Sequence, residues 1–86
     1  MQFPTVHLNG TDYKTLYNEY MNAYDRVDDA LQALREVTVH GRDYYVQDGN
    51  AFEQARREHI ERLEKLESVK RDLEKIIINL NDQVTK

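Results

Sequence analysis

The stretch YKTLYNEYMNAYDRVDDALQAL, residues 13 to 34, decides the fold of this chain. Its main apolar row has spacings of four and three without interruption and consists of Tyr13, Tyr17, Tyr20, Tyr24, Val27, Leu31 and Leu34. This heptad spacing is typical of a helix that packs along one seam. A second row repeats every seven residues and consists of Leu16, Ala23, Ala30 and Val37. The apolar stripe is therefore wider than a two-stranded seam requires, which predicts a bundle of at least four helices.

Local signals at both ends predict a helix over residues 11 to 38. Thr11 is a suitable N-cap, and Asp12 suits the positive end of the helix dipole. The β-branched run at residues 37 to 39 weakens the helix, and Gly41 can adopt the left-handed conformation that ends it.

A second helix is predicted over residues 50 to 83. Asn50 and Glu53 resemble a capping box at its start. Its seam repeats every seven residues and consists of Phe52, His59, Leu66, Leu73 and Leu80. Four Glu residues precede a cation by four positions, the favourable orientation for ion pairs on a solvated face: Glu53/Arg57, Glu58/Arg62, Glu61/Lys65 and Glu67/Arg71. Lys70, beside the seam, is expected to snorkel outward.

The two segments predict an all-α antiparallel helical hairpin, in one domain, that follows an extended arm at residues 1 to 10. The longer second helix should overhang the first and leave residues 76 to 80 partly uncovered, where the arm could lie over them. A lone hairpin buries one face of each helix, which rarely offsets the conformational entropy of ordering about 80 residues. We therefore expect self-association into a four-helix or larger bundle.

The loop at residues 39 to 49, VHGRDYYVQDG, is richer in aromatic and charged residues than a chain reversal requires. Its candidate ligand-binding residues are His40, Arg42, Asp43, Tyr44 and Tyr45. Arg42 and His40 suit a phosphate, the tyrosines offer faces for stacking on bases, and Asp43 can accept from a base edge or ribose hydroxyl. The alternative is a structural plug, in which the aromatic residues cap the core and Arg42 pairs with Asp43 or Asp48.

The tyrosine row at the start of the first helix also has two interpretations. Tyrosine hydroxyl groups need a partner or water, so the row is best explained as an amphipathic packing interface. The alternative is an aromatic wall that stacks ligand bases in the groove of an oligomer.

Composition excludes several classes of function. The chain has 86 residues, 40% of them hydrophobic, and 12 Lys and Arg against 16 Asp and Glu give a net charge of −4. This charge disfavours binding to duplex nucleic acid, which usually requires a basic surplus. There is no Cys, no membrane-spanning apolar run, no metal-ligand spacing of His residues and no nucleophile or phosphate-loop motif. We expect a protein without enzymatic activity, cofactor, metal or membrane contact.

VHLNGT at residues 6 to 11 and HGRDYY at residues 40 to 45, followed by a charged helix, resemble a group of small bacteriophage and prophage proteins. The resemblance covers nearly the whole chain and implies a phage protein in the cytoplasm of an infected bacterium, with no catalytic residues. With the loop, it leads us to expect a non-enzymatic accessory protein, such as a counter-defence protein that binds and sequesters a small nucleotide signal. The competing hypothesis is a helical interaction module that docks on a host or phage protein.

Overall fold

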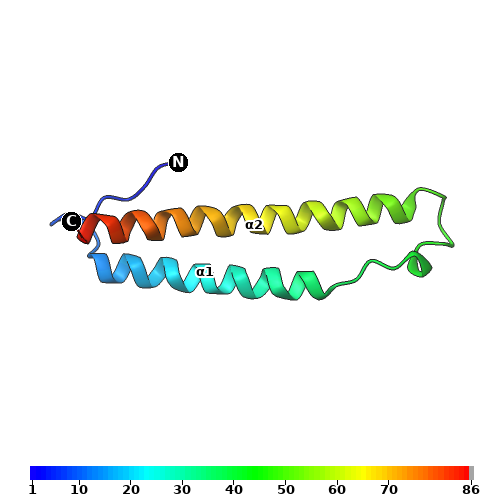
Figure 1. Ribbon diagram of the computed structural model, residues 1–86, viewed down its shortest axis with the longest axis horizontal. Helices are drawn as coiled ribbons and strands as arrows, with labels where there is room; N and C mark the ends of the chain where they lie inside the picture. Colours follow the sequence, from blue (N-terminus) through cyan, green and yellow to red (C-terminus); the bar gives the residue numbers. More distant parts are fainter. Residues whose placement is uncertain (86) are drawn as a thin grey trace.

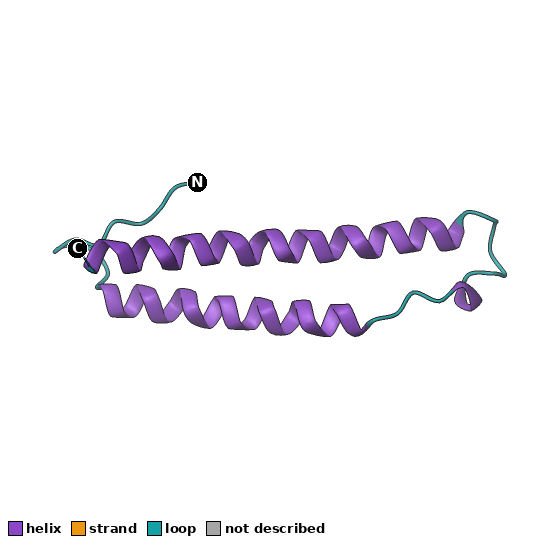
Figure 2. Ribbon diagram, in the orientation of Figure 1, coloured by secondary structure: helices purple, strands orange, loops and turns teal. Residues whose placement is uncertain are grey.

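The computed structural model describes residues 1–85 and confirms the all-helical hairpin. Helix α1 spans Tyr13–Glu36, helix α2 spans Ala51–Val84, and a short 3-10 turn, η1, spans Gly41–Asp43. The described part contains no strand (Figure 2). The two α-helices lie side by side and antiparallel in a molecule that measures 61 × 21 × 20 Å (Figure 1). The periodic apolar rows therefore pack one helix against the other.

Helix α1 begins and ends at different residues from those predicted. Asp12, and not Thr11, is the N-cap: its carboxylate accepts hydrogen bonds from the backbone N–H of Thr15 at 3.1 Å and from the Thr15 hydroxyl at 2.8 Å. These two bonds hold the pKa of Asp12 below its ordinary value, and the bond from the Thr15 hydroxyl has the larger effect. The helix ends at Glu36 because Val37 is already extended, and Gly41 does not adopt the predicted left-handed conformation.

The capping box predicted for α2 is wrong. Asn50 precedes the helix, but its backbone is already helical and its side chain makes no capping bond. Its N–H donates instead to Oδ1 of Asp48 at 3.2 Å, while Glu53 pairs with Arg56 at 3.1 Å. A loop residue, Asp48, therefore provides the hydrogen-bond acceptor next to the start of α2.

The core is a single layer of contact between the two helices. Among the described residues, only Leu31 and Leu80 are fully buried, and the other residues of both seams are half-buried. Two helices leave each other's flanks open to solvent, so a heptad pattern can be correct while few of its residues become fully buried. Most of the apolar stripe of α1 is therefore half-buried, and only Ala30 and Val37 of its two rows are exposed.

The overhang of α2 lies at the opposite end from the one predicted. The Tyr13 hydroxyl donates to Oδ1 of Asn81 at 3.3 Å, so the start of α1 is level with the end of α2. Leu80, expected to be partly uncovered, is instead buried. The loop from residue 37 to residue 50 extends beside the first turns of α2, so the difference in helix length is taken up at the tip of the hairpin (Figure 1).

The N-terminal arm lies against the C-terminal end of α2 and is held there by one side chain. Gln83 accepts a hydrogen bond from the Val6 N–H at 2.8 Å and donates to the Pro4 carbonyl at 2.8 Å. Apolar contact contributes less than expected, because Leu8 is 98% exposed. The arm therefore lies near the predicted end of α2, where polar bonds to Gln83 hold it, but the overhang that it was expected to cover is not at this end.

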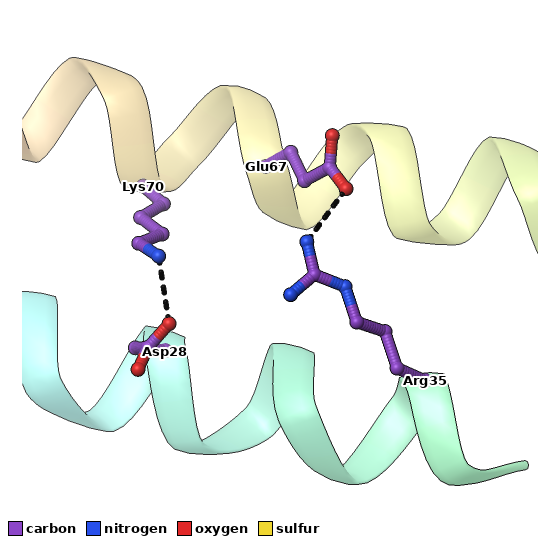
Figure 3. Close-up of polar contacts among 4 residues, drawn as sticks. All are labelled: Asp28, Arg35, Glu67 and Lys70. Carbon is purple, nitrogen blue, oxygen red and sulfur yellow. Dashed lines mark hydrogen bonds and ion pairs between the residues drawn. The ribbon is translucent and has the colours of Figure 1, made fainter.

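Ion pairs join the two helices where pairs within α2 were predicted. None of the four predicted pairs forms in residues 1–85. Glu67 instead accepts from Arg35 of α1 at 3.0 Å, and Lys70, predicted to snorkel outward, donates to Asp28 of α1 at 2.7 Å (Figure 3). The opposite helix offers these side chains partners that lie closer than those one turn away.

Candidate functional site

The loop at the tip of the hairpin is ordered by backbone hydrogen bonds between residues that are close in sequence. Within it, Asp43 N–H donates to the His40 carbonyl at 3.1 Å and Tyr44 N–H donates to the Gly41 carbonyl at 3.0 Å, which together form η1. A further turn follows, in which Gln47 N–H donates to the Tyr44 carbonyl at 3.0 Å. Local turns therefore set the positions of the candidate side chains.

The structure separates the two adjacent tyrosines. Tyr44 is half-buried, and its ring centroid lies 6.5 Å from that of Phe52 in the first turn of α2. Tyr45 is 80% exposed and Val46 is also exposed. The plug interpretation therefore fits Tyr44 alone, because Tyr45 and Val46 cover nothing at this end of the molecule.

The three polar candidates at the tip, His40, Arg42 and Asp43, have exposed side chains. Within residues 1–85 these side chains make neither a hydrogen bond nor an ion pair. The expected alternative, in which Arg42 pairs with Asp43 or Asp48, is not found. The polar groups of these three side chains are therefore unpaired within the described part of the chain.

A shallow hollow of about 230 Å³ lies between the loop and the first turns of α2. It is lined by Tyr44, Gln47, Asp48, Ala51, Gln54, Ala55 and Glu58. Of the five predicted site residues, only Tyr44 contributes to it. Its two carboxylates and two amides suit hydrogen-bond donors or cations, whereas a phosphate would have to lie outside it, at Arg42 and His40.

Sequence reasoning missed the contribution of α2 to this hollow. Ala51, Ala55 and Glu58 are spaced by four and three residues, so they share one side of the helix. The two alanines leave room where larger side chains would fill the space. That spacing was the available signal, but only the path of the loop shows which side of α2 faces it.

The tyrosine row of α1 lies in the contact between the helices. All four tyrosines are half-buried, and the ring centroids of Tyr13 and Tyr17 are 5.5 Å apart. The Tyr13 hydroxyl has its partner in Asn81, and the Lys70 ammonium lies 5.5 Å from the centroid of the Tyr24 ring. These contacts agree with an amphipathic packing interface, in which rings pack while polar groups find partners.

Neither a metal cluster nor a membrane span is present in the described part of the chain. Residues 1–85 contain no group of three or more His, Cys, Asp or Glu side chains that could hold a metal ion. No helix there has both the length and the apolar character needed to cross a membrane.

No protein-family model, curated protein or solved structure matches the chain. The resemblance carried by the motifs at residues 6 to 11 and 40 to 45 therefore stays a prediction.

Proposed function

We propose that this protein is a non-enzymatic helical interaction module, a phage accessory protein that acts in the bacterial cytoplasm by association. The single observation that carries the proposal is the small core: Leu31 and Leu80 alone are fully buried among residues 1–85. In its active form the hairpin associates with itself in a four-helix or larger bundle, which can then dock on a host or phage protein.

The shape of the molecule supports this proposal. The radius of gyration is 18.9 Å, whereas a compact domain of this length is expected near 12 Å. An elongated hairpin leaves most of its apolar side chains only half-buried, and a second layer of helices would cover them more fully.

Light scattering on the purified protein tests the self-association. We expect a mass of at least two chains at micromolar concentration, and thermal unfolding whose midpoint rises with protein concentration, because association stabilises the folded chain by mass action. A folded monomer whose unfolding is independent of concentration would contradict the proposal.

A small nucleotide signal bound at the tip is the second candidate function. It is favoured by the exposed Tyr45 ring and the exposed side chains of Arg42 and His40, which belong to the same loop. In this proposal Arg42 and His40 hold phosphate, Tyr45 and the exposed part of Tyr44 stack on bases, and Asp43 accepts from a base edge or ribose hydroxyl.

A thermal-shift screen against cyclic dinucleotides, cyclic oligonucleotides and ADP-ribose derivatives tests the second function. A ligand at a hundredfold excess over its dissociation constant should stabilise the protein by about 2.7 kcal/mol. Arg42→Ala should abolish the shift and leave helicity intact, while the matched control Arg71→Ala, on the exposed side of α2, should retain the shift. If none of these compounds shifts the unfolding midpoint, the nucleotide function is wrong.

A further inference from the structure

We propose that a second copy of this chain packs against one particular face of the hairpin, with the α2 helices of the two copies antiparallel across a two-fold axis between Ser68 and Val69. This inference rests on the proposed self-association and adds the face and the orientation. An isologous contact of this kind uses the same surface on both copies and closes into a dimer, a four-helix bundle.

Polar contacts mark one face of the hairpin, which we call the bridged face. Three pairs join the helices there: Tyr13–Asn81, Asp28–Lys70 and Arg35–Glu67 (Figure 3 shows the last two). At about 100° per residue, the three α2 members of these pairs lie within roughly 60° of one another, to one side of the seam leucines. The polar side chains of these three pairs on the bridged face therefore already have partners within the chain.

The opposite face, which we call the open face, is mostly apolar in its middle and has no such contacts among residues 1–85. The apolar residues that helical periodicity places near its middle are Ala23, Val27, Ala30 and Leu34 of α1, and Val69 and Ile76 of α2. Ala30 is exposed, Val69 is 45% exposed and the other four are half-buried. In the antiparallel hairpin, the side of α2 that carries Val69 and the side of α1 that carries Val27 both face away from the bridged face.

The hairpin exposes more surface area than a compact monomer of its mass, which leaves enough surface for a partner to cover. The described chain exposes 6542 Å², whereas a compact monomer of its 10.2 kDa mass is expected to expose about 5,300 Å². A standard stable interface covers about 800 Å² on each partner. The excess of about 1,200 Å² is therefore sufficient for one such interface.

Charges along the edge of the open face are self-complementary for an antiparallel α2 contact. Glu58, Lys65, Asp72 and Asn79 are spaced by seven residues and form a line along α2. A two-fold axis midway between residues 68 and 69 places Lys65 opposite the second copy's Asp72, and Glu58 opposite the second copy's Asn79. Opposite charges meet twice and like charges do not, which favours this register. The axis also falls within about one residue of the middle of α2, so the two helices overlap almost completely.

The side chains of α1 fit the same axis by size. An antiparallel contact centred between residues 28 and 29 places Ala23 opposite Leu34 of the second copy, and Val27 opposite its Ala30. Each pair combines a smaller residue with a larger one, the arrangement that lets layers interdigitate. Because Asp28 bonds Lys70, this level of α1 lies beside residues 69 and 70 of α2. One axis therefore serves both helices.

Single-cysteine cross-linking tests the face and the orientation, because the natural chain has no Cys. Val69→Cys places a thiol next to its own symmetry mate, and a short bismaleimide should link two chains in high yield. The bismaleimide is preferred to a disulfide because packed helix axes lie 8–10 Å apart, beyond easy disulfide reach. Ile78→Cys is the matched control: Ile78 is a similarly exposed aliphatic residue, at 52%, nine residues along and so about half a turn around α2. It should cross-link poorly.

Light scattering on both variants separates the possible failures. A dimer in which Val69→Cys cross-links no better than Ile78→Cys would overturn the face and orientation while leaving self-association intact. A monomer at every concentration would overturn both. As a second readout, Val69→Asp should shift the protein towards monomer at least tenfold in dissociation constant, and Ile78→Asp should not; equal effects of the two would also overturn the assignment.

Discussion

The ammonium group of Lys70 in α2 lies 2.7 Å from the carboxylate of Asp28 in α1 and joins the two helices near the middle of the hairpin (Figure 3). The hydrogen bond lowers the pKa of Asp28 and raises the pKa of Lys70 relative to their ordinary values. Lys70 also lies over the Tyr24 ring. A residue expected to point outward therefore links the two helices at this level.

The pH dependence of stability should reveal this bond. Because the pKa of Asp28 is lowered by folding, its contribution is complete above the ordinary value of about 3.9 and is lost as the pH falls through the folded value. Because the pKa of Lys70 is raised, its contribution is complete below about 10.4 and is lost as the pH rises through the folded value. The difference in unfolding midpoint between the natural chain and Lys70→Met should be largest between these limits. A difference that is the same at pH 2, 7 and 12 would show that only packing is involved.

Removal of a buried leucine should be costly. Leu31→Ala should lower the free energy of unfolding in urea by about 2–5 kcal/mol, because it deletes a large share of the fully buried apolar surface. Val37→Ala, at an exposed position just after α1, is the control and should change it by less than about 0.5 kcal/mol. Similar losses in both variants would mean that Leu31 is not part of a core.

The helix cap distinguishes two neighbouring residues. Asp12→Ala should lower helicity and the unfolding midpoint by a few degrees, since the Thr15 N–H loses its acceptor. Thr11→Ala should have little effect, although Thr11 was the N-cap predicted from the sequence. Circular dichroism of the two variants at neutral pH checks this, and a larger loss from Thr11→Ala would reverse the assignment.

The N-terminal arm should depend on Gln83 for its position against α2. In Gln83→Ala the Val6 amide loses its acceptor, so its hydrogen exchange should become fast while that of α2 stays slow. Gln54→Ala, a glutamine on the same helix that does not contact the arm, should leave exchange at Val6 unchanged. Slow exchange at Val6 in Gln83→Ala would show that other contacts hold the arm.

The two loop tyrosines should respond differently to substitution. Tyr44→Ala removes the contact with Phe52 and should destabilise the protein by about 1 kcal/mol, whereas Tyr45→Ala should be nearly neutral for stability. If a nucleotide binds at the tip, Tyr45→Ala should weaken its binding without changing the unfolding midpoint of the free protein. Chemical denaturation with and without ligand measures both effects.

The sequence by itself determined the two helices and their hairpin, because the periodic apolar rows and the turn-rich segment between them are local signals. It also placed the candidate residues together in one loop. It did not indicate that Tyr44 would pack while Tyr45 stayed exposed, nor that the first turns of α2 would form the wall of a hollow. Both outcomes depend on the path of the loop beside α2.

Tertiary structure alone decided which charged side chains pair and at which end of the hairpin α2 extends beyond α1. Glu67 and Lys70 have acceptable partners within their own helix, but the opposite helix brings Arg35 and Asp28 closer. The overhang lies at the tip because the start of α1 is level with the end of α2. Periodicity fixes which side of a helix is apolar, but the register between two helices follows from the contacts that form when they pack.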